Sequence, residues 1–433
     1  MATNLTLVSG TTRIDLNDRV SYFLQAGYYP EVELNEDRVT ETVKVQLRGD
    51  IPAQVQSVNR LFERARSQDP AIEKVYLEYQ VQEGETAWRS RIYNGAVTPT
   101  SGLAREFSRG RVNVEIAFER DPFWEGPETT LPIGNVNNGK VFNCNDGSGT
   151  APNMMVNSAS VAAGLILGDL PTPVRLELVN NHTKKLSTLW IGMNNTRPDW
   201  TTGWMLEAED ALGITPVTAT GASGGAIAKG QMTFGGTPQP ILRWEITDSM
   251  VSSMRGQRVR MLLRAFYLGQ YAKFKYKIRI VSGVTAVYET DWLRVSELYA
   301  RHWLDLFDFR LPPWLEGESD LSGLVLELWA APIAQGTWTW AFDDVMLLAQ
   351  DGLVNLETST EQGGKVVIDG ERGWSEDAAG KKTGLRRMAG SLMLTPGEKH
   401  VFFFAMHSVF ADDAPIDMSL TVSGSYRPRR LTI

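Results

Sequence analysis

Short segments in which apolar and polar residues alternate recur along most of this sequence. The clearest examples are residues 38–47, 112–118, 259–267 and 274–280. Successive side chains of a β-strand point to opposite faces of the sheet, so this alternation is typical of a strand with one buried face. A chain with many such segments and a single clear helical pattern is predicted to be mainly β.

The helical pattern follows Asp50, whose carboxylate is suited to cap a helix, and it has Pro52 in its first turn. Apolar residues then recur at helical spacing and form one stripe: Val55, Val58, Leu61, Phe62 and Ala65. The helix is predicted to end near Ser67. The pattern of this one helix and of six or seven strands in residues 1–130 predicts a partly open β-barrel or curled sheet with the helix on one side.

The length of 433 residues indicates several domains, since one domain takes roughly 100 to 200 residues. A stretch rich in Gly and Asn, 132–152, is predicted to be turns and a linker after a first domain, 1–130. Residues 199–350 hold nine of the thirteen tryptophans and are predicted to form a further β-sandwich. Segments 131–198 and 351–433 have too few strands to stand alone. We therefore expect them to pair into one outer sandwich, with the Trp-rich block as an insertion.

Within the Trp-rich block, one strand pattern places basic residues opposite an apolar face. Lys273, Lys275, Lys277 and Arg279 alternate with apolar residues, so we expect them to point away from the core. Residues 218–236 are rich in Gly, Ala and Ser and are predicted to be a long surface loop.

The composition is that of a soluble globular protein, with 42% apolar and 22% charged residues. The net charge of -8 disfavours tight binding of nucleic acid, which relies on Lys and Arg contacts to phosphate. The single cysteine, Cys144, cannot form an internal disulfide, and the first residues do not have the pattern of a secretory signal. We expect folding in a reducing cytoplasm. No apolar run approaches the roughly 20 residues that cross a bilayer, so no membrane span is expected.

Several motifs resemble those of the distal tail proteins of long-tailed phages with non-contractile tails. Residues 120–124, Arg-Asp-Pro-Phe-Trp, match the segment that ends the family's first domain. Residues 149–150, Gly-Thr, and residues 171–178 match the turn, proline and strand that open its outer sandwich. The closing half has the family's Ile-Asp-Gly turn at 368–370, its Leu-x-Pro-Gly turn at 394–397, and its terminal Tyr-x-Pro-Arg at 426–429. The insertion departs from the simplest members and looks like the carbohydrate-binding-type jelly rolls of elaborated relatives.

The resemblance implies a tail-tube-like β-barrel with one flanking helix, followed by a galectin-like β-sandwich that an inserted jelly-roll sandwich interrupts. It also implies a homo-hexameric ring at the tail tip of the virion, assembled in the host cytoplasm, which joins the tail tube protein to the tail tip hub protein. DNA would pass through the ring without specific binding. We expect strands 38–47 and 111–119 to pair across copies, so that no sheet edge stays open.

Five tryptophans of the inserted block are the candidate carbohydrate-binding residues: Trp200, Trp204, Trp292, Trp303 and Trp314. Flat aromatic rings stack on sugars, and indole N–H groups can donate to hydroxyls. Trp is also an ordinary core residue, and packing is the commoner role. Trp314, which follows Leu311, Pro312 and Pro313, is the one we expect to be the most exposed.

No catalytic or metal-binding motif is convincing. Residues 221–225 match Gly-x-Ser-x-Gly without the helix that a nucleophilic serine requires, and the four histidines do not have metal-ligand spacing. A carboxylate pair for glycoside cleavage would have to come from five acidic residues: Asp305, Asp308, Glu316, Glu318 and Asp320. We interpret these as an acidic surface loop, and Asp343-Asp344 as ordering the last strand of the block. No enzyme activity, cofactor or metal site is expected.

The preferred hypothesis is therefore a structural ring protein of a phage tail, connecting the tube to the tip. The alternative is an adhesin module of the tail tip that binds a host surface glycan through the insertion. A polysaccharide depolymerase is the third hypothesis.

Overall fold

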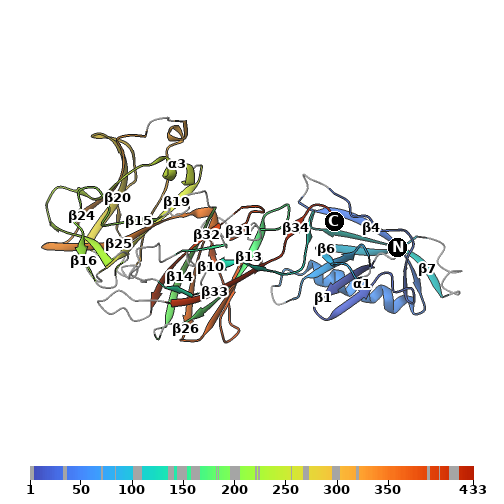
Figure 1. Cartoon of the computed structure of the whole chain (residues 1–433). Coiled ribbons are helices and arrows are strands. Elements are labelled where there is room, and N and C mark those ends of the chain that lie inside the picture. The colour runs from blue at the N-terminus through green and yellow to red at the C-terminus, as the bar shows by residue number, and fades with distance from the viewer. Residues whose placement is uncertain are drawn as a thin grey trace. The chain divides into compact units, whose positions relative to one another are not determined.

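The computed structural model describes residues 4–32, 37–69, 72–82, 84–100, 110–134, 141–143, 154–157, 166–181, 183, 185–195, 205–219, 222, 225–254, 256–266, 273–294, 303–317, 321–387, 391–398, 400–408 and 419–433. They divide into two compact units. Unit 1 comprises Met1–Thr129, Leu167–Thr172 and Arg427–Ile433, and unit 2 comprises Thr130–Ile166 and Pro173–Tyr426. Both are mainly β, as the alternation predicted (Figure 1). In the described part, no helix is long and apolar enough to cross a membrane.

Unit 1 is built on one sheet with the strand order β2-β1-β5-β6-β7-β4-β3. Its strands are β1 (Asn4–Ser9), β2 (Thr12–Asp15), β3 (Tyr22–Leu24), β4 (Val39–Arg48), β5 (Val75–Gln80), β6 (Trp88–Pro99) and β7 (Arg111–Arg120). The first and last strands of this order, β2 and β3, follow each other in the sequence. Their connection reaches at most about 25 Å, whereas seven strands laid flat span about 29 Å. The sheet must therefore curl, which agrees with the predicted barrel.

The predicted helix is present as α1 (Ile51–Arg66), with Asp50 accepting a hydrogen bond from the Ala53 N–H at 3.2 Å. The predicted stripe is buried except for Val55, which is half-buried. Phe62 of α1 packs directly against Gly95 of β6, where an added Cβ would lie 2.4 Å from the ring. Only glycine fits at this close approach of helix and sheet.

The expectation that β4 and β7 pair across copies is wrong for β7. β7 pairs with β4 on one side and with β6 on the other. β4 pairs with β7 over its whole length, and on its other side β3 covers Val45–Leu47. The alternation identifies the buried face of a strand, but it carries no signal for the strand's position in the sheet. β2 and β3 are the outer strands.

The end of the chain belongs to unit 1, which corrects the expectation that all of residues 351–433 belong to the outer sandwich. Strand β34 (Arg429–Arg430) pairs with β8 (Trp124–Glu125), and Leu170 forms a bridge with Arg429. The Thr172 hydroxyl donates to the Arg427 carbonyl at 2.6 Å. Unit 1 therefore combines three segments that are far apart in the sequence.

Unit 2 contains the predicted outer sandwich, and its two halves pair as expected. One sheet has the order β10-β12-β32-β14-β26-β30, formed by β10 (Ile133–Gly134), β12 (Met154–Asn157), β32 (His400–Ser408), β14 (Leu186–Asn195), β26 (Leu353–Thr360) and β30 (Arg386–Arg387). The other has the order β11-β33-β13-β27-β28-β29, with β31 and β9 beside it: β11 (Val141–Asn143), β33 (Ser419–Tyr426), β13 (Thr172–Asn180), β27 (Lys365–Asp369), β28 (Trp374–Glu376), β29 (Lys382–Gly384), β31 (Met393–Leu394) and β9 (Thr129–Leu131). Strands from before and after the insertion pair with each other in both sheets: β32 lies between β12 and β14, and β13 lies between β33 and β27.

His400 of β32 is fully buried in this sandwich, and its Nε2 accepts the Thr395 N–H at 3.0 Å. Burial lowers the pKa of His400 to about 4, so the folded protein binds fewer protons than the unfolded chain between pH 6.5 and 4. We therefore expect stability to fall as pH drops through this window, by up to about 1.4 kcal/mol per pH unit. Urea unfolding at several pH values tests this. His400→Gln should flatten the dependence, and an equally acid-sensitive variant would contradict the assignment.

The insertion forms a second sandwich. One sheet has the order β16-β17-β25-β19-β23 with β15 beside β25: β16 (Val217–Thr218), β17 (Ala226–Thr233), β25 (Thr337–Ala349), β19 (Arg258–Ala265), β23 (Trp303–Arg310) and β15 (Met205–Glu207). The other has the order β18-β24-β20-β21 with β22 beside β20: β18 (Gln239–Glu245), β24 (Leu324–Pro332), β20 (Phe274–Ser282), β21 (Thr285–Glu289) and β22 (Leu293–Arg294). The short helices are α3 (Asp248–Met254), η5 (Pro313–Gly317) and η6 (Gln350–Gly352).

The prediction of a surface loop over 218–236 is wrong for its second half. Residues Ala226–Thr233 form β17, which pairs with β25, and Ile227, Ala228 and Met232 are buried. Small residues suit this position because Gly230 lies against the Trp340 ring, only 2.3 Å from where a Cβ would be. The Gly and Ala content that indicated a loop instead allows a strand to pack closely on an aromatic ring.

The insertion shares a hydrophobic core cluster with the outer sandwich. Trp190, Leu353 and Phe403 of the outer sandwich belong to the same cluster as Leu348 at the end of β25. At Gly192 of β14, an added Cβ would lie 2.7 Å from the Leu348 side chain. The insertion is thus packed onto its host sandwich and not merely tethered to it.

Candidate functional site

The Arg-Asp-Pro-Phe-Trp segment holds a buried ion pair that sequence reasoning missed. Arg120, at the end of β7, is 0% exposed and binds Glu41 of β4 through Nε and Nη2, at 3.0 and 2.5 Å. The Tyr28 hydroxyl also donates to Glu41, and burial, followed by the Glu41 charge, raises the pKa of that hydroxyl. The Arg120 guanidinium lies 4.7 Å from the Trp124 ring centroid. Glu41 lies on the buried face of β4, where the other residues are apolar. Nothing near it in the sequence indicates its partner, Arg120.

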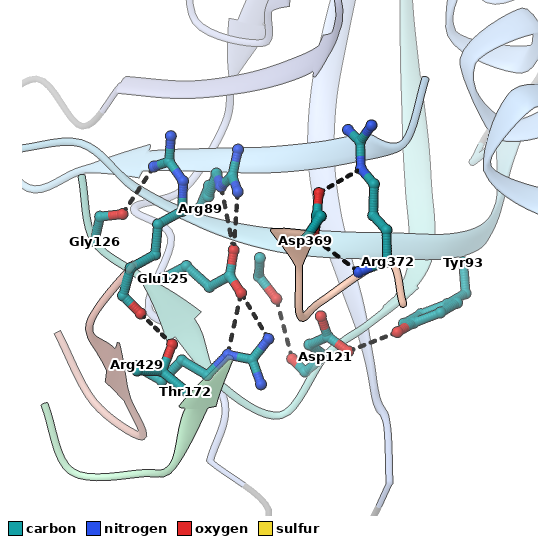
Figure 2. A network of polar contacts seen from close by, with 11 residues as sticks. Arg89, Tyr93, Asp121, Glu125, Gly126, Thr172, Asp369, Arg372 and Arg429 are labelled. Carbon is teal, nitrogen blue, oxygen red and sulfur yellow. Dashed lines mark hydrogen bonds and ion pairs between the residues drawn. The ribbon is translucent and has the colours of Figure 1, made fainter. Parts of the chain in front are cut away.

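The residues after this segment bind the returning end of the chain. Figure 2 shows Glu125 between two arginines: Arg89 lies 3.1 Å from one carboxylate oxygen, and Arg429 of β34 lies 2.8 Å from the other. Arg427 donates to the Gly126 carbonyl at 2.9 Å. Glu125 is only 5% exposed, so both pairs are shielded from solvent. This network joins the segment that ends the first domain to the segment that ends the chain.

A second polar cluster lies in the insertion, where β15 meets β25. Glu207, Glu209 and Asp343 each place a carboxylate oxygen within 4.8 Å of the others. Asp344, which is fully buried, is the register partner of Glu207. Arg264 contacts two members of this group, lying 3.0 Å from Asp343 and 3.7 Å from Asp344. Its guanidinium therefore compensates part of the negative charge of the cluster.

The negative charge of the cluster affects the pKa of Glu209. Burial, together with the Asp344 and Asp210 carboxylates, raises the pKa of Glu209 to about 7. Its Oε2 is buried and accepts no hydrogen bond within the described residues. A buried carboxylate oxygen without a donor is costly, and it is stabilised most directly by a cation. Because the ligand atoms are all oxygens, the arrangement suits a hard divalent cation such as Ca²⁺.

The sequence analysis interpreted Asp343-Asp344 as ordering the last strand and expected no metal site. The ion pairs with Arg264 agree with an ordering role, but the cluster also has the ligands for a cation. Its members come from β15, the following turn and the distant β25, with no local spacing to link them. Only the pairing of β15 with β25 brings them together.

The five candidate tryptophans are not gathered into one site by the described residues. Trp200 and Trp204 lie outside these residues, as does the side chain of Trp303, whose backbone begins β23. Trp314 lies in η5 and is 44% exposed, as expected. Trp292 is half-buried, and Lys275 and Lys277 approach its ring to 4.8 and 5.1 Å.

Two of the acidic residues considered for catalysis are held in ion pairs. Asp305 of β23 binds Arg260 through both oxygens, at 2.5 and 2.8 Å, and Asp308 binds it at 3.0 Å. A carboxylate committed to an arginine in this way is poorly placed to act as an acid or a nucleophile. Glu318 and Asp320 lie outside the described residues.

No family model and no curated protein matches the chain. Among solved structures, it is similar to the SPP1 Dit protein, which is described as a paradigm of the hub adsorption apparatus in phages that infect Gram-positive bacteria, with 9% identity, a TM-score of 0.28 and 98% of each chain covered. It is also similar to a chain of the phage P2 baseplate, with 10% identity, a TM-score of 0.30 and 100% of each chain covered.

Proposed function

We propose that this protein is a structural component of a phage tail tip, in which copies of unit 1 form a ring that connects the tail tube to the tip and surrounds the DNA channel. The resemblance of the motifs suggests six copies, the tube and hub proteins as neighbours, and a place in the virion. The proposal includes no enzymatic activity.

The observation that carries the proposal is the exposed apolar side chains on the outer strand β3 and on the segments before and after it. Four large apolar side chains are exposed between residues 20 and 32: Val20 at 76%, Phe23 at 37%, Tyr29 at 85% and Val32 at 42%. In the described residues, β3 pairs only with β4. An outer strand with exposed apolar side chains is a liability for a monomer and is suited to a contact with another copy. A ring requires this contact to be heterologous, with a different surface of the neighbouring copy.

The acidic composition agrees with a channel that lets DNA pass. The chain carries a net charge of -8, and a surface with excess carboxylates repels phosphates. The packed insertion would then extend the ring with a rigid module that can face the host. These features support a scaffold that positions other proteins.

Charge placed beside β3, on the segments before and after it, should separate the copies. We expect the double variant Val20→Asp and Tyr29→Asp to weaken association by at least about 100-fold, because each carboxylate would be buried without a partner in the contact. Sedimentation velocity of the full-length protein measures this. Val284→Asp is the control, because Val284 is 98% exposed in the hairpin between β20 and β21 of the insertion. The proposed contact is wrong if the double variant assembles like the control.

Binding of a host surface glycan is the second candidate function. It is favoured by the exposed Trp314 and by the aromatic and basic side chains around Trp292. Both lie in the insertion, so this function is compatible with the ring.

A further inference from the structure

We infer that the outward face of the β18-β24-β20-β21 sheet binds the anionic groups of a polysaccharide, with Lys275, Arg294 and Trp292 at the centre of the site. The choice of a host-surface polymer rests on the proposed position at the tail tip. The placement of the site rests on the sheet itself.

The basic residues of β20 lie on the outward face, as the alternation predicted. Phe274, Tyr276 and Ile278 are fully buried in the sandwich core, and the lysines and arginine between them are half-buried. Outward residues on one strand are about 6.5 to 7 Å apart. The face therefore presents a row of cations in a chain that is acidic as a whole.

Part of this row is neutralised within the sheet. Glu289 of β21 lies 3.0 Å from Lys277 and 3.3 Å from Arg279. Glu327 of β24 binds Arg243 at 3.0 Å, and it also accepts the Trp329 indole N–H at 2.6 Å. These cations need no external ligand.

Lys275 and Arg294 differ from these cations. They are register partners on β20 and β22, so two like charges lie directly opposite each other. Neither has a carboxylate within ion-pair distance among the residues that the structure describes. Like charges in this position destabilise a sheet. An anionic group bound between them would remove the repulsion, and this is the main reason to assign the site here.

Trp292 shapes the chemistry of the ligand. Lys275 and Lys277 lie over its ring, so part of the ring surface that would stack on a neutral sugar already contacts cations. The ring can instead hold the Lys275 ammonium toward solvent, beside the edge of a sugar. A carboxylate or phosphate on a sugar polymer fits both features.

Duplex DNA is a poorer fit for this face. It carries one negative charge per about 1.7 Å of axis, and dense charge of this kind would meet the carboxylates of Glu245, Glu289 and Glu327 on the same face. A polysaccharide with one anionic group every sugar or two can place its charges at Lys275 and Arg294 and avoid these carboxylates.

Binding of the full-length protein to polygalacturonate tests the inference. We expect salt-sensitive binding that Lys275→Gln with Arg294→Gln weakens by about tenfold or more, since charge-assisted contacts are lost. The control is Lys185→Gln with Lys365→Gln, which removes the same charge from the outer sandwich. These lysines pair with Glu361 and Glu177. The control should bind polygalacturonate like the wild type. Neutral dextran, which has no anionic group, should not bind.

Equal binding by the Lys275/Arg294 variant and the control would overturn the site. Duplex DNA binding as tightly as polygalacturonate would overturn the polysaccharide assignment. Sedimentation of the same samples separates this test from that of the ring. If the Lys275/Arg294 variant assembles like the wild type but does not bind polygalacturonate, the site is supported. If the wild type binds polygalacturonate as a monomer, the ring is refuted and the site is not.

Discussion

Arg120→Met should destabilise unit 1 by about 3 to 5 kcal/mol, because it leaves the Glu41 carboxylate buried without its guanidinium. Glu41 is 3% exposed, and the carbonyls of Glu31 and Asp121 also accept from Arg120, so three acceptors lose their contact with the guanidinium at once. Hydrogen exchange of the β4 and β7 amides reports this directly, since these strands pair over their whole length. Their protection should decrease by at least about 100-fold.

Arg38→Met is the matched control for this prediction. It removes an arginine from an exposed ion pair between the residue just before β4 and Glu119 of β7, at 3.1 Å, and exposed pairs contribute about 0 to 1 kcal/mol. Adding Glu41→Gln to Arg120→Met should recover part of the loss, because no charge is then buried alone. An Arg120→Met protein within about 1 kcal/mol of the wild type would show that the pair is not a major support of unit 1.

Calcium should stabilise the chelator-treated protein by about 3 to 4 kcal/mol when its concentration is several hundred times the dissociation constant. The cation would bind the carboxylates of Glu207, Glu209 and Asp343, whose mutual repulsion it relieves. Thermal unfolding with and without calcium measures the effect. Glu209→Gln with Asp343→Asn should abolish the response, whereas Glu245→Gln, which changes an exposed carboxylate of the same sandwich, should keep it.

The response to calcium should depend on pH. Because the pKa of Glu209 is raised from 4.5 to about 7, the folded protein binds more protons than the unfolded chain in this range. Without a cation, this group therefore makes stability fall as pH rises from 4.5 to 7. Calcium displaces the proton, so its stabilising effect should be larger at pH 7.5 than at pH 5. An equal effect at both pH values would place the cation elsewhere.

Local patterns predicted the elements of this fold well. The stripe and cap of α1 and the alternation in β4, β7 and β20 identified both the elements and their buried faces. The pairing of strands across the insertion was also predicted, because neither half of the outer sandwich has enough strands alone. These signals depend on residues close together in the sequence or on simple strand counts.

The predictions that were wrong or missing concern residues whose partners are distant in the sequence. Glu41 looks like an ordinary polar residue of β4 until Arg120 lies beside it, and β7 looks like a possible edge until β4 and β6 flank it. The carboxylate cluster requires the pairing of β15 with β25. In β17, the small residues that indicated a loop are required by the Trp340 ring, which a single sequence does not reveal.

Electron microscopy of the purified full-length protein, combined with its mass in solution, tests the ring most directly. We expect particles with six-fold symmetry, an open centre and a mass six times that of the 48.1 kDa chain. A species of 48.1 kDa at every concentration, with no ring in the images, would contradict the account.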